Sequence, residues 1–333
     1  MISLIGRRLV FVIPTLLFLS VLVFALSLSI GSDRAIASRV GEGTGAQSAI
    51  AIQHAREQLQ LDKPIVTRYV NWLSGVVRFD FGQSFTKLVT VSGPDGSDIQ
   101  GQPVSQAIGG ALPRTASLAL VAIVFSALVG TVVGIIGGVR PGGWLDRLCT
   151  VLATTGLALP SFLVGMLLVI PLAVQYRLLP AVGYTQISDG GVWGWLEHLL
   201  IPGIALGLAP AAIVARQTRS AFADVMGSTY IRTAWAKGAS LPRVVLVHAL
   251  RNAASAPLTV YGLIVAQLFS GVVVIETLFG ISGMGSLMVN AVRSSDVPML
   301  QACIMLFAVF TIVANLVIDL LYGLLNPKVR TTS

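Results

Sequence analysis

Six long apolar runs constrain this chain more than any other feature of its sequence. As a helix, each run is long enough to cross the hydrocarbon core of a bilayer, which needs about 20 residues. The mean hydropathy is +0.84 and 11% of the residues are charged, which is too apolar for an ordinary water-soluble domain. The sequence therefore predicts an all-α membrane protein with six transmembrane helices. The runs cover residues 9–30, 115–138, 148–172, 199–219, 253–275 and 299–325.

The first run can also be interpreted as a secretory signal peptide, because Arg7 and Arg8 precede it. Its length of about 22 residues corresponds to about 33 Å of helix, which suits a full crossing better than the shorter apolar region of a signal peptide. We therefore expect residues 1–30 to be an amino-terminal tail followed by a retained transmembrane helix.

Cations are distributed unevenly over the segments between the runs. If the amino end is cytoplasmic, the short outer segments hold only Arg177 and Arg293. This asymmetry predicts six spans with both termini in the cytoplasm. The net charge of +8 does not indicate nucleic-acid binding, because the cations form no continuous stripe with interleaved aromatic residues. The short inner segments hold Arg7, Arg8, Arg140, Arg147, a cluster from Arg219 to Arg251, Lys328 and Arg330.

The segment of residues 31–113 is polar enough to lie outside the membrane. We expect helices over residues 47–61 and again after Pro64, where Ile65, Tyr69, Leu73 and Val76 follow one side. These helices either cover the outer mouth of a pathway or form a packed surface domain, and the sequence leaves both open. Residues 89–102, rich in Gly, Asp and Ser, look like an insertion.

A basic segment, residues 220–252, separates the fourth and fifth runs. Ser228 is placed to cap a helix over residues 229–237, and Gly238 stands where a helix end favours a left-handed residue. Ser240 and Pro242 can open a second helix. The first helix has an apolar stripe of Ile231, Ala234 and Trp235, and the second has Leu241, Val244 and Val245, with His248 one turn further on. One interpretation is a rigid knob for a soluble partner; the other is a juxtamembrane loop that touches anionic lipid.

Two motifs in this segment decide between the interpretations. Tyr230-x-Arg232-Thr233-Ala234-x-Ala236-Lys237-Gly238 and His248-Ala249-Leu250-Arg251-Asn252-Ala253 resemble the cytoplasmic coupling loop of ABC importer permeases. The resemblance is closest to the first permease of the oligopeptide, dipeptide and nickel branch, and it extends from Arg7 to Pro327 apart from the insertion. The general motif has Glu-Ala-Ala where Arg232-Thr233-Ala234 stands, a departure that the peptide branch shares. The resemblance implies the type I importer fold, with a core permease domain of five transmembrane helices over residues 114–333.

The resemblance also implies a function. The chain would form half of the pathway for oligopeptides or dipeptides across the bacterial plasma membrane, with nickel or glutathione as alternative substrates. Its expected partners are a second homologous permease, two ABC ATPases that bind ATP and Mg, and an extracytoplasmic substrate-binding protein. The residues expected to couple to the ATPase are Tyr230, Arg232, Thr233, Ala234, Lys237, Gly238, Arg243, His248 and Arg251.

The sequence predicts no catalytic, cofactor or metal site in this chain. No Gly-x-x-x-x-Gly-Lys-Ser/Thr occurs, so no phosphate-binding loop, no catalytic residue and no cofactor are predicted. His54, His198 and His248 are scattered, which argues against a metal site. Cys149 and Cys303 lie near the starts of runs that begin on opposite sides of the bilayer, which argues against a disulfide.

A second group of candidates follows the fifth run. Glu276-Thr277-Leu278-Phe279-Gly280-x-x-Gly283-Met284-Gly285, with Asp296-Val297-Pro298 beyond it, resembles the outer re-entrant segment of peptide permeases. This segment is either an outer gate or an ordinary loop that Glu276 stabilises. The outer-gate candidates are Glu276, Phe279, Gly283, Gly285 and Asp296.

Charged and polar residues inside spans are costly, so those that occur are candidates for the pathway or for structural pairs. Arg216 and Arg219 near the inner end of the fourth run can pair with Asp319 of the sixth run or line the path. The full set of polar candidates is Arg216, Gln217, Gln267, Asn315 and Asp319.

Two other classes of transport protein are disfavoured. A secondary transporter needs ionisable groups near the middle of its spans to bind a coupling ion, and these positions carry almost no charge. A channel would place its polar residues around a pore, whereas the most conspicuous polar segment lies between spans.

Overall fold

The computed structural model describes residues 2–30, 63–93, 96–253 and 255–325. The helix predicted over residues 47–61 and the carboxyl-terminal residues Asn326–Lys328 lie outside the described residues. The chain divides into two compact units. The large unit is built mainly of Ala116–Ile281, and the small unit of Gly6–Thr115 and Ser282–Phe310.

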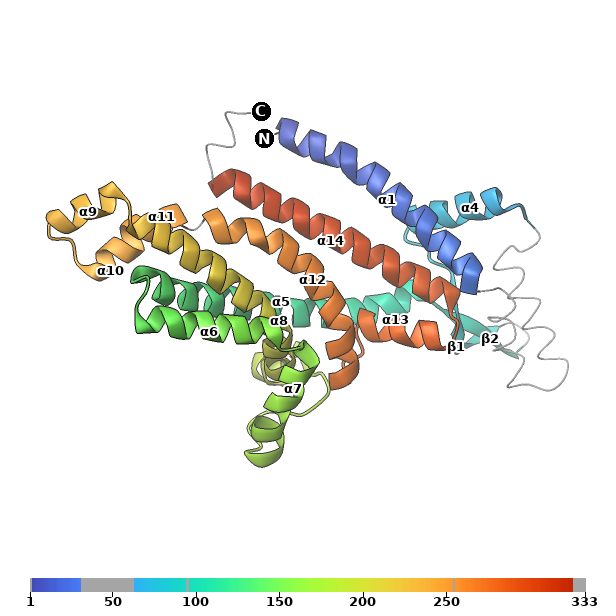
Figure 1. Ribbon diagram of the computed structural model, residues 1–333. Helices are drawn as coiled ribbons and strands as arrows, with labels where there is room; N and C mark the ends of the chain where they lie inside the picture. Colours follow the sequence, from blue (N-terminus) through green and yellow to red (C-terminus); the bar gives the residue numbers. More distant parts are fainter. Residues whose placement is uncertain (1, 31–62, 94–95, 254, 326–333) are drawn as a thin grey trace. The chain divides into compact units, whose positions relative to one another are not determined.

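Most described residues are helical, as the apolar runs predict (Figure 1). The described strands form an antiparallel hairpin, β1 (Gln83–Gly93) and β2 (Gly96–Pro103), paired from Gln83↔Pro103 to Gly93↔Gly96. Only helices were predicted in this segment, although Val89, Thr90 and Val91 are β-branched residues that favour a pleated conformation. The helices are α1 (Ile2–Ile30), α4 (Ile65–Val77), α5 (Val104–Val139), α6 (Trp144–Ala158), α7 (Ser161–Val169), α8 (Ile187–Met226), α9 (Thr229–Ala236), α10 (Leu241–Arg243), α11 (Leu250–Ala253), α12 (Ser255–Phe279), α13 (Met284–Arg293) and α14 (Val297–Leu325), with π-helical segments at Ile170–Gln175 and Val244–Ala249.

Three described helices are long and apolar enough to cross a membrane: α5, α8 and residues Val297–Ile318 of α14. The number rises to five if each of two interrupted helix pairs counts as one span, and α1 adds a shorter apolar stretch, Val12–Leu28. The run at residues 148–172 is not one straight helix, because α6 and the helical segment Ser161–Gln175 meet at 104°. Pro160 explains this break, since the residue before a proline is disfavoured in helical conformation, and Leu159 is extended.

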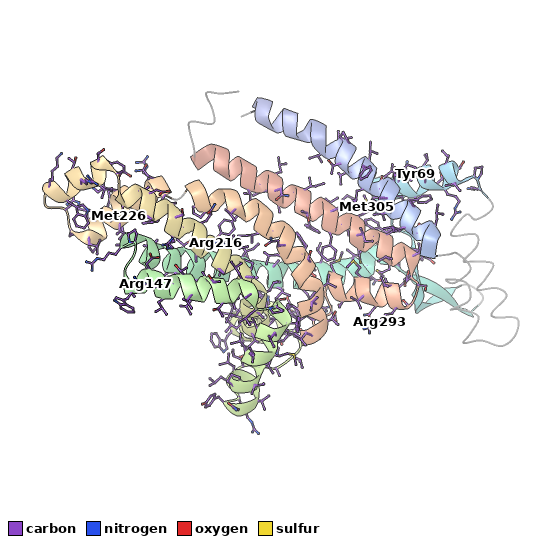
Figure 2. The ribbon with its side chains drawn as sticks, viewed as in Figure 1. Tyr69, Arg147, Arg216, Met226, Arg293 and Met305 are labelled. Carbon is purple, nitrogen blue, oxygen red and sulfur yellow. The ribbon has the colours of Figure 1, made fainter. Side chains whose placement is uncertain are left out.

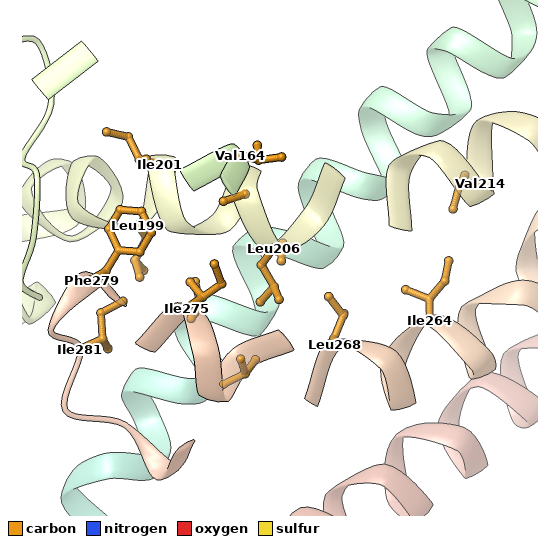
Figure 3. Packing of buried hydrophobic residues seen from close by; sticks show 14 residues of the cluster. Val164, Leu199, Ile201, Leu206, Val214, Ile264, Leu268, Ile275, Phe279 and Ile281 are labelled. Atoms are coloured by element: carbon orange, nitrogen blue, oxygen red, sulfur yellow. The ribbon is translucent and has the colours of Figure 1, made fainter. Parts of the chain in front are cut away.

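The core of the large unit lies between α5, α7, α8 and α12. Figure 3 shows Leu206 of α8 facing Leu268 and Ile275 of α12, with Phe279 and Leu199 at one end of the cluster. These five side chains are at most 4% exposed. The apolar face of α8 is therefore the centre around which the neighbouring helices pack.

Glycines bring α5 and α8 into close contact. Gly130, Gly134 and Gly138 recur every four residues on α5, and a Cβ atom at each would lie 2.6–2.7 Å from a backbone oxygen of α8. Spacing of this kind lets membrane helices approach closely and pack their backbones together. Successive glycines meet residues further along α8, so the two helices run parallel.

The small unit has a separate apolar core contributed by α5, α13 and α14. Its buried residues include Ile108, Met284 and Met299. A buried hydrogen bond from the Ser84 hydroxyl to the Asp296 carboxylate ties the start of β1 to the start of α14. On the other side of this unit, Tyr69 of α4 lies beside α1 (Figure 2).

Candidate functional site

The basic segment between α8 and α12 folds as the two-helix knob expected from the sequence. Figure 1 shows α9, α10 and α11 gathered at the carboxyl end of α8. Helix α9 ends in a Schellman motif, in which the Gly238 amide donates to the Trp235 carbonyl (2.9 Å) and the Ala239 amide to the Ala234 carbonyl (3.1 Å). Gly238 has φ +79°, a left-handed value that glycine adopts without strain. The bend of the knob is therefore fixed by backbone hydrogen bonds.

An apolar underside attaches the knob to α8. Ile231 of α9 and Val244 and Ala249 of the following π-helical segment are fully buried, and they pack with Phe222 of α8. The predicted stripes are correct for Ile231 and Val244 but not for Trp235, which is 41% exposed. Trp235 thus belongs to the outer face of the knob.

The outer face of the knob is cationic. Arg232, Lys237, Arg243 and Arg251 are all exposed, as is Thr233. Within the described part of the chain, none of these four cations forms an ion pair. Tyr230 is also exposed, and its hydroxyl accepts a hydrogen bond of 2.9 Å from the Asn252 amide, which joins α9 to α11. Ala234 and His248 are half-buried.

One local detail differs from the sequence prediction. The Ser228 hydroxyl does not cap α9 but donates back to the Val225 carbonyl at 2.6 Å. At Gly238, a Cβ atom would meet nothing within 4 Å in this chain. Gly238 is thus required in the isolated chain by its left-handed backbone and not by crowding.

An ion pair connects α8 to α6 just before the knob. The Arg219 guanidinium donates two hydrogen bonds to the Asp146 carboxylate, one of them of 2.7 Å from Nη2. Asp146 is 4% exposed and also accepts the Gly142 amide at 2.8 Å. Arg219, expected either to pair with Asp319 or to line the path, thus pairs with Asp146 of α6, which the sequence did not indicate. Asp146 stands beside the Pro141–Gly143 turn in the sequence, but its partner is 73 positions away.

The outer-gate candidates fall in different units. In the large unit, Glu276 is fully buried, and Phe279 is a core residue whose carbonyl accepts the Gly183 amide at 2.8 Å. In the small unit, Gly283 precedes α13, and Gly285 is buried within it. Asp296 caps α14, because its carboxylate accepts the Met299 amide at 3.3 Å as well as the Ser84 hydroxyl.

The polar candidates of the spans mostly occupy exposed helix faces. Arg216 and Gln217 of α8 and Gln267 of α12 are exposed, and Figure 2 marks Arg216 on α8. Asn315 of α14 has a buried side-chain oxygen without a hydrogen-bond partner among the described residues. The side chain of Asp319 lies outside the described residues. Exposed polar groups on membrane helices are costly against lipid, which favours a protein or aqueous neighbour.

Comparisons with known proteins agree with this architecture. Among solved structures, the methionine ABC transporter MetNI in an inward-facing conformation matches 68% of this chain and 100% of its own, with TM-score 0.56 and 15% identity, a likeness of fold. A probable peptide ABC transporter permease of Sinorhizobium fredii is 35% identical over 326 residues, 97% of this chain and 98% of its own. The glutathione transport system permease of Escherichia coli K12 is 36% identical over 330 residues, 99% of each chain.

Two family models match most of the chain. Residues 1–119 match the amino-terminal part of binding-protein-dependent transport system membrane components. Residues 130–331 match the binding-protein-dependent transport system inner membrane component. The chain is therefore an integral membrane protein of the type I fold and belongs to the permeases of ABC importers, in the branch that includes peptide and glutathione permeases.

Proposed function

We propose that this chain forms half of a translocation pathway for peptides across the bacterial plasma membrane. The named functions of its relatives support peptides as the substrate class. Glutathione is the second candidate, supported by the similarity to the glutathione permease, and it is itself a small peptide. The second half of the pathway is a homologous permease, and a substrate-binding protein delivers the substrate from outside.

The observation that carries this proposal is the knob at the end of α8. Its apolar underside is anchored, its bend is fixed by the Schellman motif, and its outer face presents cations together with Tyr230 and Trp235. Such a surface suits a groove on a soluble subunit. Two ATPase subunits bind ATP and Mg, and each presses on one permease, so that this chain moves without hydrolysing nucleotide. Both termini then lie in the cytoplasm, with the knob.

The other candidate residues have supporting roles in the pathway and at the outer end of the chain. Arg216, Gln217 and Gln267 line the pathway or the contact with the second permease, and Asn315 and Asp319 stay candidates for the same role. Glu276 and Phe279 stiffen the outer end of α12, and Gly283, Gly285 and Asp296 shape the segment that follows it. Residues 31–113 follow α1 on the extracytoplasmic side of the membrane.

The proposal is tested by substituting Gly238 with arginine in the reconstituted complex. We expect Gly238→Arg to abolish transport and the ATP hydrolysis stimulated by the binding protein, because a large side chain at the bend separates the knob from its groove. Both activities are measured in proteoliposomes that hold the permeases and the ATPases.

Gly142→Arg is the matched control. Gly142 has φ +82°, close to that of Gly238, and likewise has nothing within 4 Å of its Cβ position, but it lies in the turn between α5 and α6. Arginine there carries the same backbone strain outside the knob, so activity should persist. Wild-type values for Gly238→Arg, or equal losses in both variants, would contradict the proposal.

A further inference from the structure

Helix α4 carries two apolar faces, and the first is packed against α1. The ring of Phe24 lies 5.5 Å from the ring of Tyr69 and 5.7 Å from that of Trp72. The Ser20 and Tyr69 hydroxyls are hydrogen-bonded at 2.8 Å. These contacts fix α4 alongside α1 within the small unit.

The second apolar face of α4 is largely uncovered by the described residues. Val66, Val70 and Val77 are 73%, 54% and 73% exposed, and with the half-buried Leu73 they follow the spacing i, i+4, i+7, i+11 of one helix face. We call these four residues the valine stripe. Thr67 and Ser74, also exposed, flank it on the polar side.

The contacts with α1 set the depth of this stripe. Ser20 and Phe24 lie inside the apolar stretch Val12–Leu28 of α1. By the rise of an α-helix, they are about 12 Å and about 6 Å from the end of that stretch at Leu28. A helix bound at these two residues lies beside the apolar stretch of α1 and not beyond it. Leu17 and Val21 of α1 are themselves 46% and 53% exposed, so α1 also presents apolar side chains that the described residues leave uncovered.

We propose that α4 is a membrane-embedded interfacial helix. Its valine stripe contacts the acyl chains of the leaflet that surrounds the carboxyl-terminal half of α1. An amphipathic helix with aromatic residues near the boundary is typical of such positions. The stripe holds no charged or hydrogen-bonding side chain, so it can contact hydrocarbon without burying an unpaired polar group. The helix was expected from its sequence to lie outside the membrane, as a cover or as a surface domain, and its contacts with Ser20 and Phe24 place it deeper. Calling this leaflet the outer one depends on the proposed orientation of the termini, whereas the depth does not.

Site-directed spin labelling of the assembled transporter in lipid nanodiscs tests this inference. Single cysteines replace Val66, Val70 or Val77 in a background with Cys149→Ala and Cys303→Ala, and collision rates with oxygen and with a water-soluble nickel chelate are measured. Thr67→Cys and Ser74→Cys report the polar flank of the same helix, and Val21→Cys in α1 reports lipid contact. We expect the oxygen-to-nickel ratio at the three stripe positions to approach that at Val21 and to exceed that at Thr67 and Ser74.

Two results would overturn the inference. A ratio at the stripe as low as that at Ser74 would mean that the stripe faces water, and low collision rates with both reagents would mean that protein covers it. Neither result depends on transport activity, so failure here is distinct from failure of the proposed importer function.

Discussion

At the scale of single residues, the ion pair between Asp146 and Arg219 has the clearest physical consequence. Asp146 is nearly buried, and it holds both the Gly142 amide and the Arg219 guanidinium. It therefore joins the turn before α6 to the last turns of α8, next to the knob. Removing one partner from a buried pair leaves a charge without its neighbour.

Asp146→Ala should destabilise the complex by about 2 kcal/mol. This is less than the cost for a fully buried pair, because the Arg219 side chain is 35% exposed and water can solvate it. Thermal unfolding in detergent measures the loss. Asp224→Ala, which removes an exposed carboxylate of the same helix α8, is the control and should change stability little. Equal effects of the two substitutions would contradict a structural role for the pair.

The same residues show what the sequence can predict at this scale. The left-handed conformation of Gly238 was predictable, because glycine after a helical pattern is a local signal that depends on backbone sterics alone. The pairing of Arg219 was not, because its partner depends on how α6 packs against α8. Trp235 was misplaced for a related reason, since a helical stripe predicts which residues share a face but not how wide the covered part of that face is.

At the scale of helices, the contact between α5 and α8 depends on small residues. Gly134 lies where a Cβ atom would be 2.6 Å from the Ala215 carbonyl oxygen, so any side chain requires the two helices to separate. The apolar runs of both helices were evident in the sequence, as was their approximate extent. The break between α6 and α7 was missed because hydropathy indicates which residues suit lipid but not the direction of the helix axis. Pro160 did indicate a break, because the residue before a proline is disfavoured in helical conformation.

Gly134→Ala should destabilise the large unit by about 1–3 kcal/mol, because overpacking forces the backbones of α5 and α8 apart. Gly110→Ala is a matched control in the same helix, since its Cβ would meet nothing within 4 Å. That substitution should be neutral or stabilise by up to about 1 kcal/mol, as alanine favours a helix over glycine. Thermal unfolding compares the stabilities of the two variants, and equal destabilisation would argue against close packing at Gly134.

At the scale of the whole molecule, the importer fold was predictable because the coupling-loop motif and the apolar runs agree. The substrate was not, since the described residues form no site whose chemistry selects one peptide. The hairpin was also missed, because residues 89–102 are rich in Gly, Asp and Ser and show no apolar periodicity that indicates a strand. These residues are mostly polar, without the run of apolar side chains that a buried core needs.

Deletion of residues 89–102 should therefore leave assembly intact. Leu88 lies opposite Gly101 in the hairpin register, and Pro103, the first residue kept after the deletion, is two positions beyond Gly101, so a short glycine linker can rejoin the chain. Co-purification of the second permease and the ATPases with the tagged, shortened chain measures assembly. If those subunits are lost while deletion leaves the chain itself stable in the membrane, the hairpin belongs to an assembly contact.

The hydrogen bond between Ser84 and Asp296 has a consequence for biosynthesis. Its two partners are separated by 212 positions, and a ribosome adds about 5–20 residues per second, so Ser84 leaves the ribosome about 10–40 s before Asp296 exists. Until then the newly made amino-terminal third of the chain lacks the cap of α14 and the apolar side chains of α13. During this interval the small unit lacks the helices that complete its apolar core, and a chain truncated before α14 would keep this unfinished state permanently.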